Sequence, residues 1–166
     1  MQKNIILIDD CNEKIFDNLS EECYILSTSL PEKFCVKFIN IATETQKIVL
    51  FYGENAVDFV KKYGADGIVA DIGCEKIKEK MLDLRKKLGK GKFVGLFTRN
   101  RRHESMIVSE VEPDFIIFKI WNDGFEKVQE LTDWYNDFFV IQSAVWPMEK
   151  GVDVSNIKTD FVVKSL

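Results

Sequence analysis

The stretch IILIDD, residues 5–10, joins a short apolar run to two aspartates, and the chain repeats this plan three more times. Each of the other runs also ends in a residue that can contact a phosphoryl group: GIVAD at 67–71, FVGLFT at 93–98 and FIIFK at 115–119. Apolar runs without alternation are typical of strands that are covered on both faces, as in a parallel sheet. An acidic pair, a carboxylate, a hydroxyl and an ammonium therefore follow four predicted strands, in that order.

Segments with the apolar spacing of helices separate these strands. A fifth strand is expected at 48–51, and helices are expected at 12–19, 56–64, 75–88, 106–111 and 122–139. Strand and helix thus alternate five times. This pattern predicts an α/β fold with a doubly wound, five-stranded parallel sheet, strand order 2-1-3-4-5, and helices on both faces.

One domain is expected to cover residues 1–139, with an insert at about 23–45. Within the insert, Pro31 precedes an apolar-rich run at 34–41 that reads as strand or loop. Residues 140–166 are expected to form a C-terminal extension rather than a separate domain. The extension holds two apolar runs that could be extra strands, Val145-Trp146 and Phe161-Val162-Val163. The apolar runs of insert and extension suggest a surface for a homodimer or another partner.

Composition narrows the class of protein. A formal net charge of −4 over 166 residues argues against nucleic acid as a direct partner. No apolar run approaches the roughly 18 residues of a membrane span, and the first residues do not read as a signal peptide. Four cysteines without a close pair, beside one histidine, indicate reduced thiols in a cytoplasmic protein. A basic cluster, Arg99, Arg101 and Arg102, is expected to be a solvated loop.

The polar strand ends are expected to form one phosphoryl-transfer site. In a doubly wound sheet, ligands bind beyond the carboxyl ends of the strands, where the strand order reverses. The order 2-1-3-4-5 would place Asp9, Asp10 and Asp71 on neighbouring strands, where Mg²⁺ would relieve the repulsion between their carboxylates. Asp71 could then attack phosphorus, while Thr98 and Lys119 hold the phosphoryl oxygens.

These residues and their spacing resemble the response-regulator receiver domain of two-component signalling. The segments that carry the resemblance are IILIDD (5–10), YGENAVDFVKKYGADGIVADI (52–72), FVGLFT (93–98) and EPDFIIFKIW (112–121). The resemblance implies that Asp71 is the phosphoacceptor and that Thr98 and Lys119 assist it. It also implies a magnesium ion bound by Asp9, Asp10, Asp71 and the backbone carbonyl of Gly73.

A stand-alone receiver would take its phosphoryl group from a sensor histidine kinase or a phosphotransfer protein. The change would then be read by a downstream protein target, without contact to nucleic acid or membrane. The chain departs from the receiver pattern at Arg99, Ile116 and Ile120, which leaves open a pseudo-receiver that only binds proteins. A phosphatase resembling haloacid dehalogenases is a further alternative, although Cys11 stands where such enzymes carry their second aspartate.

Overall fold

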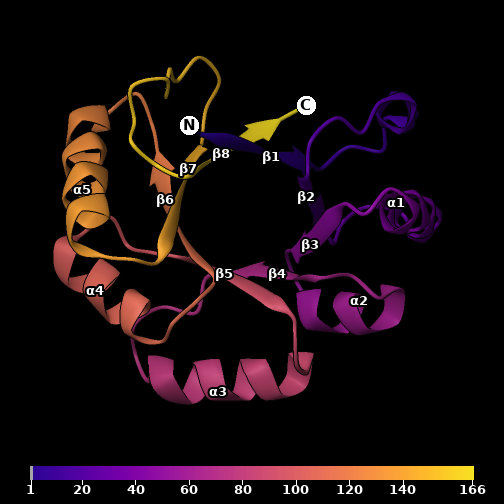
Figure 1. Cartoon of the computed structure of the whole chain (residues 1–166), viewed down its shortest axis with the longest axis horizontal. Helices are drawn as coiled ribbons and strands as arrows, with labels where there is room; N and C mark the ends of the chain where they lie inside the picture. Colours follow the sequence, from indigo (N-terminus) through magenta and orange to yellow (C-terminus); the bar gives the residue numbers. More distant parts are fainter. Residues whose placement is uncertain (1) are drawn as a thin grey trace.

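The computed structural model describes residues 2–166, and its eight strands form one closed parallel barrel. The strands follow one another around the barrel in chain order, and β8 pairs in parallel with β1 to close it. Figure 1 looks down the axis of this ring. The strands are β1 (Lys3–Ile8), β2 (Cys23–Ser27), β3 (Ile48–Tyr52), β4 (Gly67–Ala70), β5 (Phe93–Phe97), β6 (Phe115–Ile120), β7 (Gln142–Pro147) and β8 (Phe161–Ser165).

Five α-helices surround the barrel, each connecting two consecutive strands from β2 to β7. They are α1 (Glu32–Glu44), α2 (Ala56–Tyr63), α3 (Ile77–Leu88), α4 (Arg102–Glu110) and α5 (Phe125–Phe138). The β1–β2 connection holds only the short 3₁₀ helix η1 (Glu13–Asp17), and a loop joins β7 to β8. Loops therefore lie outside β8 and β1, where the other strands have a helix (Figure 1).

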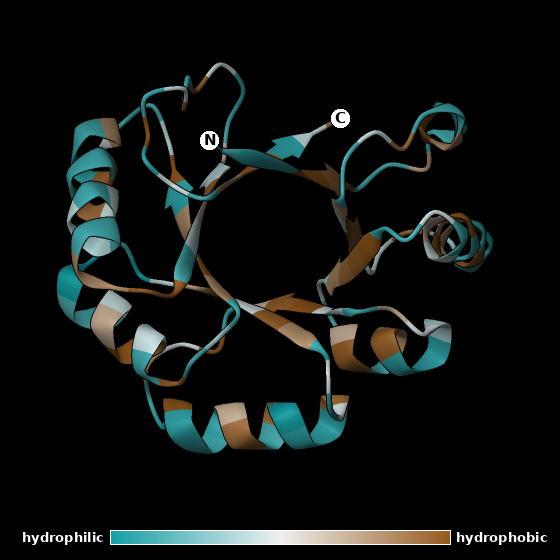
Figure 2. Cartoon of the chain, in the orientation of Figure 1, coloured by the Kyte–Doolittle hydropathy of each residue, from teal (hydrophilic) through white to brown (hydrophobic). Residues whose placement is uncertain are grey.

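Side chains alternate between two apolar cores along every strand, as the period of a strand requires. One core fills the barrel interior and is built from residues such as Ile5, Ile25, Leu50, Val69 and Ile117. The other lies between the strands and the helices and is the larger of the two. Figure 2 accordingly shows mostly hydrophobic strands, apart from hydrophilic segments in β1 and β8, surrounded by helices that carry hydrophilic residues.

The predicted five-stranded doubly wound sheet is therefore wrong. The pairing that decides the matter is that of β1, which lies between β2 and β8 and not beside β4. Strands buried on both faces are found in open parallel sheets and in closed barrels alike, so the apolar runs did not distinguish the two folds. The distinguishing elements lie in residues 23–27 and 140–166, which the prediction treated as an insert and an extension.

The segment expected to be strand or loop around residues 34–41 is part of helix α1. Phe34, Cys35, Phe38 and Ala42 are buried at the spacing of one helix face. Phe34 and Phe38 stack at a centroid distance of 6.3 Å. The segment thus completes a β2–α1–β3 unit that belongs to the barrel.

Within residues 2–166, no helix combines the length and the apolar character that crossing a bilayer requires.

Candidate functional site at the carboxyl ends of the strands

All eight strands run in the same direction, so their carboxyl ends surround one mouth of the barrel. Active sites of parallel eight-stranded barrels lie at this mouth, on the loops that follow the strands. Here a cavity of about 310 Å³ lies over the ends of β4, β5 and β6. Its walls are formed by Asp71, Thr98, Arg99, Asn100, Arg101, Lys119 and Trp121.

The cavity carries an excess of positive charge. Arg99, Arg101 and Lys119 line it, against the single carboxylate of Asp71. An Arg99 guanidinium nitrogen (Nη2) lies 3.8 Å from Oδ1 of Asp71, with 62% and 36% of the two side chains exposed. An ion pair as exposed as this one is weak, so Arg99 remains able to bind another anion. The field of the cavity therefore attracts negatively charged ligands.

Lys119 is the cation that reaches into the barrel interior. It follows the interior-facing Ile117 by two residues, is half-buried, and its Nζ lies 4.8 Å from the centre of the Phe97 ring. Phe97 also packs against Tyr52 and Trp146, with ring centroids 5.7 and 5.2 Å away. These three rings fill the barrel beneath the mouth, and Phe97 holds the ammonium by a cation–π contact.

The loop after β5 is attached to the end of β6. Nδ2 of Asn100 donates a hydrogen bond to the backbone carbonyl of Lys119, at 2.7 Å. The backbone N–H of Thr98 donates to the carbonyl of Ile117, at 3.0 Å. The two bonds fix the arginine-bearing loop relative to Lys119, so the cationic groups are positioned before a ligand arrives.

Asp71 has a local structure of its own. Its Oδ1 accepts a hydrogen bond from the backbone N–H of Gly73 at 3.2 Å, in a turn that Gly73 makes with a φ of 69°. Nζ of Lys80, on α3, donates to the carbonyl of Ile72 at 2.9 Å and holds the same loop. The carboxylate is thus oriented by its own loop and by Arg99.

Cys74, in the same loop, is the cysteine nearest this site. Burial raises the pKa of its thiol, and the Glu104 carboxylate raises that pKa further, whereas Arg99 lowers it. The thiol is therefore protonated near neutral pH and is a poor nucleophile.

Thr98 lines the cavity, but its hydroxyl is engaged elsewhere. The side chain is 5% exposed, and its Oγ1 lies 2.9 Å from Oγ of Ser105 on α4. Ser105 also donates to the carbonyl of Arg101, at 2.8 Å. The hydroxyl pair fastens the start of α4 to the end of β5.

Asp9 and Asp10 are exposed residues that follow β1, and neither lines this cavity. The prediction placed them beside Asp71 because it made β1 and β4 neighbours. In the barrel β2 and β3 lie between those strands, each adding about 4.8 Å of separation. The structure thus groups Asp71, Thr98 and Lys119 but not the acidic pair.

The residues at this mouth do not fit the magnesium ion that the resemblance implied. Asp71 is the only carboxylate in the cavity wall, and Mg²⁺ prefers several carboxylate oxygens. In the part of the chain that the structure describes, residues 2–166, no three His, Cys, Asp or Glu side chains gather closely enough to hold a metal ion. Magnesium binding therefore stays a prediction from the sequence.

Sequence reasoning considered Arg99 as a residue that restricts entry or adds a second cation for the phosphate, but it assigned no role to Asn100, Arg101 or Trp121, and all four line the cavity. The arginines were expected to be solvated, which agrees with their exposure but not with their position at a cavity. Each of the four lies within four residues of a strand's carboxyl end. That position would have identified them had the barrel been foreseen, because loops after barrel strands carry the active site.

No protein-family model and no curated protein matches this sequence. Among solved structures, the chain is similar to orotidine 5′-monophosphate decarboxylase from Methanocaldococcus jannaschii, with 16% identity and a TM-score of 0.67 over 99% of this chain and 89% of that one. It is also similar to KGPDC from Streptococcus mutans, with 10% identity and a TM-score of 0.61 over 99% and 88%. The YdjI aldolase of Escherichia coli K12 has 11% identity and a TM-score of 0.71 over 98% and 74%. At such identities the likeness shows the fold, which is the (β/α)₈ barrel.

The barrel overturns the resemblance to receiver domains. Four predictions depended on the receiver fold and are therefore wrong: the phosphorelay function, the histidine-kinase or phosphotransfer partner, the downstream signalling target and the pseudo-receiver alternative. The physical reason is that short buried strands ending in polar residues are shared by all parallel α/β architectures. Their order around the sheet, which the sequence does not display, decides which of those polar residues meet.

Proposed function

We propose that this chain is an enzyme that acts on a small phosphorylated metabolite at the carboxyl-terminal mouth of its barrel. The observation that carries the proposal is the cavity wall there, with three cations against one carboxylate. A volume of about 310 Å³ suits a small metabolite, since ligand pockets span about 300–1,000 Å³.

The printed names of several similar structures support a phosphorylated substrate. They include a 3-keto-L-gulonate-6-phosphate decarboxylase from Vibrio cholerae and a 3-hexulose-6-phosphate synthase, at 11% and 15% identity. Orotidine 5′-monophosphate decarboxylase is likewise named for a phosphorylated substrate. This support is analogy at the level of the fold, since one barrel architecture hosts many reactions.

Arg99 and Arg101 are the groups we assign to the phosphate. A guanidinium presents paired N–H donors that match phosphate oxygens, and its charge strengthens each bond. Both arginines follow β5 and are exposed, so they can close on a ligand without leaving a buried charge unpaired. Asn100 is bonded to the end of β6 and keeps their loop in place.

Lys119 is the group we assign to the reacting end of the substrate. Its ammonium is half-buried against Phe97, where a positive charge stabilises a developing oxyanion more strongly than it would in water. Asp71 lies across the cavity and can accept or hold a proton. The pair suits reactions in which an enolate or carbanion forms beside a carbonyl group, as in decarboxylation and aldol chemistry.

Calorimetric titration with sugar phosphates and the matching free sugars tests the binding half of the proposal. We expect binding only with the phosphate, and we expect Arg99→Gln and Arg101→Gln each to weaken it about 10- to 100-fold, the range for a charge-assisted hydrogen bond. Arg102→Gln is the matched control, because the Arg102 guanidinium lies 5.1 Å from the Trp134 ring and does not line the cavity. Equal binding of free sugars, or equal losses from all three variants, would refute the assignment.

Proton exchange in deuterated water tests the chemical half. The phosphate ligands that bind should lose carbon-bound protons or carbon dioxide, recorded by NMR, at a rate that Lys119→Met lowers by at least about 100-fold. Lys119→Arg keeps the charge but changes the reach, so it should retain binding with reduced turnover. Phosphate-dependent binding with no reaction for any ligand would contradict an enzyme and leave a binding protein.

A further inference from the structure

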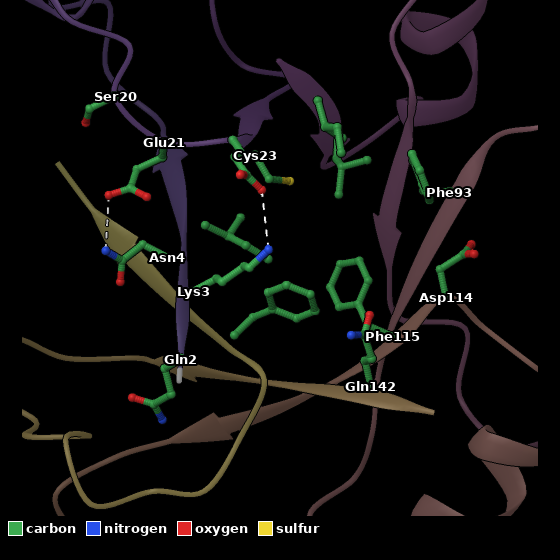
Figure 3. Close-up of a pocket in the computed structure, with 15 residues that line it drawn as sticks. Gln2, Lys3, Asn4, Ser20, Glu21, Cys23, Phe93, Asp114, Phe115 and Gln142 are labelled. Atoms are coloured by element: carbon green, nitrogen blue, oxygen red, sulfur yellow. Dashed lines mark hydrogen bonds and ion pairs between the residues drawn. The ribbon is translucent and has the colours of Figure 1, made fainter. Parts of the chain in front are cut away.

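A second cavity, of about 590 Å³, lies at the opposite, amino-terminal mouth of the barrel (Figure 3). Its walls come from the first residues of the strands, including Ile5 of β1, Cys23 of β2, Ile48 of β3 and Phe93 of β5. The proposed enzyme site does not use it. The volume falls within the range of pockets for drug-sized ligands.

The floor of this amino-terminal cavity is apolar and partly open. It is built from interior-facing side chains of five strands: Ile5, Ile48, Leu50, Phe93, Phe115 and Phe161. Phe115 and Phe161 meet edge to face at a centroid distance of 6.0 Å. Phe93 is 39% exposed, and Ile48 and Phe161 are only partly buried. Apolar area remains in contact with water that a ligand would displace, at about 25 cal/mol per Å².

Gly95 on β5 explains how the Phe115 ring fits inside the amino-terminal end of the barrel. A Cβ at Gly95 would lie 2.4 Å from the end of the Phe115 ring, so this ring lies against the β5 wall of the barrel. On β4, a Cβ at Gly67 would lie 2.1 Å from the carbonyl oxygen of Phe93. Because Gly67 and Gly95 carry no side chains, β4 and β5 approach each other closely and the Phe115 ring packs directly against the backbone of β5.

The rim of the amino-terminal cavity is acidic, and some of its carboxylates already form ion pairs or hydrogen bonds. Three carboxylates line it, Glu21, Glu22 and Asp114, against the single ammonium of Lys3. Lys3 lies 3.6 Å from Glu22, and Asn4 donates to Glu21 at 3.1 Å (Figure 3). Asp114 is held by Arg85 at 3.3 Å, outside the cavity wall. The rim therefore repels anions, in contrast to the cationic mouth at the other end.

Cys23 places a sulfur atom between floor and rim. Burial, together with the nearby Asp66 carboxylate, raises the pKa of its thiol to about 12. Near neutral pH the group is an uncharged, weakly polar wall atom. The floor of the amino-terminal cavity thus carries no charged group that could pair with a bound ion.

We propose that the amino-terminal mouth is a second binding site, which takes an uncharged molecule with an aromatic ring and one hydrogen-bonding group. The ring would lie on Leu50, Phe115 and Phe161, because aromatic pairs there gain from offset or edge-to-face packing. The polar group would face the amide of Gln142 at the rim. Phosphorylated compounds would be excluded by the rim carboxylates.

Methyl NMR with naphthol as the probe tests the site. We expect saturable shifts of the methyl signals of Ile5, Ile48 and Leu50 in the full chain. Naphthyl phosphate carries the same rings with an anionic group, and we expect it to shift these signals with at least about tenfold weaker affinity, as like-charge repulsion requires. Unchanged signals with naphthol, or equal affinity for the two probes, would overturn the proposal.

A matched pair of variants at the rim shows where the probe binds. Gln142 is exposed and lines the cavity, so Gln142→Trp should narrow the entrance without disturbing the buried core, while Gln142→Ala should leave it open. We expect naphthol affinity to fall at least about tenfold in Gln142→Trp alone, with far-UV circular dichroism confirming that both variants fold. Equal affinity in the two variants would place the probe elsewhere. The site stands apart from the proposed enzyme site, so Arg99→Gln should bind naphthol as the wild type does.

Discussion

Some residues of the carboxyl-terminal mouth could be predicted from the sequence, because polar and charged residues directly follow the apolar runs of the strands. Asp71 and Lys119 were found from the apolar runs that precede them, and both line one cavity. Thr98 was found in the same way, yet its hydroxyl contacts α4, since successive strand residues point to opposite faces. Phe97 faces the barrel interior, so its neighbour Thr98 had to face outward. The sequence shows that neighbouring strand residues point to opposite faces, but it does not show which of the two faces points into the barrel.

The hydroxyl of Thr98 should therefore contribute to stability rather than to ligand binding. Thr98→Val removes one of the two hydrogen-bond partners of the buried Ser105 hydroxyl, the other being the Arg101 carbonyl, and we expect a loss of about 1–3 kcal/mol in the free energy of unfolding. Urea denaturation measures this loss, and Thr98→Ser should retain most of the stability. If Thr98→Val abolished phosphate binding while unfolding at the wild-type urea concentration, the hydroxyl would belong to the ligand site.

The pKa of Cys23 gives a second prediction at this scale. A thiol reacts as its thiolate, and a pKa of about 12 keeps Cys23 protonated at pH 8. Iodoacetamide at pH 8 should modify the exposed Cys11 first and leave Cys23 intact in the folded chain. Reaction at Cys23 should rise as the pH approaches 12. Peptide mass mapping reports each site, and rapid labelling of Cys23 at pH 8 would contradict the burial described here.

At the scale of elements, the strands and helices from β3 to α5 were predictable, whereas β2 and α1 were not. The sequence CYILS of β2 is a short apolar run without alternation, and the following Pro31 suggested irregular structure. In fact Pro31 precedes α1 directly, a position that proline tolerates because the first N–H groups of a helix have no partner within it. The apolar run after it is helical in spacing. Because residues 34–41 were predicted to be strand or loop, the unit formed by β2 and α1 was missed.

Substitution of Gly95 on β5 tests how the strands pack inside the barrel. Gly95→Ala would press a methyl group onto the Phe115 ring, and we expect a cost of about 1–3 kcal/mol in the free energy of unfolding. The cost should fall when Phe115→Leu removes the ring, so a double-mutant cycle should give a favourable coupling of about 0.5–3 kcal/mol. Thermal or urea unfolding of the four proteins measures it. Strict additivity of the two changes would show that Gly95 and Phe115 are not in contact.

At the scale of the whole molecule, closure of the barrel was the feature that no local pattern displayed. Parallel strands covered on both faces fit an open sheet and a barrel equally, and the two differ only in how the ends of the sheet meet. Here the last strand, β8, pairs with the first, β1, from Lys3↔Phe161 to Leu7↔Ser165. The long-range pairing turns a row of strand ends into a ring, with a cationic mouth and an acidic mouth.

Cysteine cross-linking across the β1–β8 seam tests closure most directly. Ile6 and Lys164 are paired residues on the outer face of the seam, whereas Ile6 and Ile68 would be on adjacent strands only in the order 2-1-3-4-5. Paired residues on neighbouring strands come within the Cα separation of about 4.4–6.8 Å that a disulfide needs. We predict, by peptide mass mapping after mild oxidation, a disulfide in the Ile6→Cys/Lys164→Cys protein and none joining the new cysteines in the Ile6→Cys/Ile68→Cys protein. The reverse result would contradict the barrel and both mouths built on it.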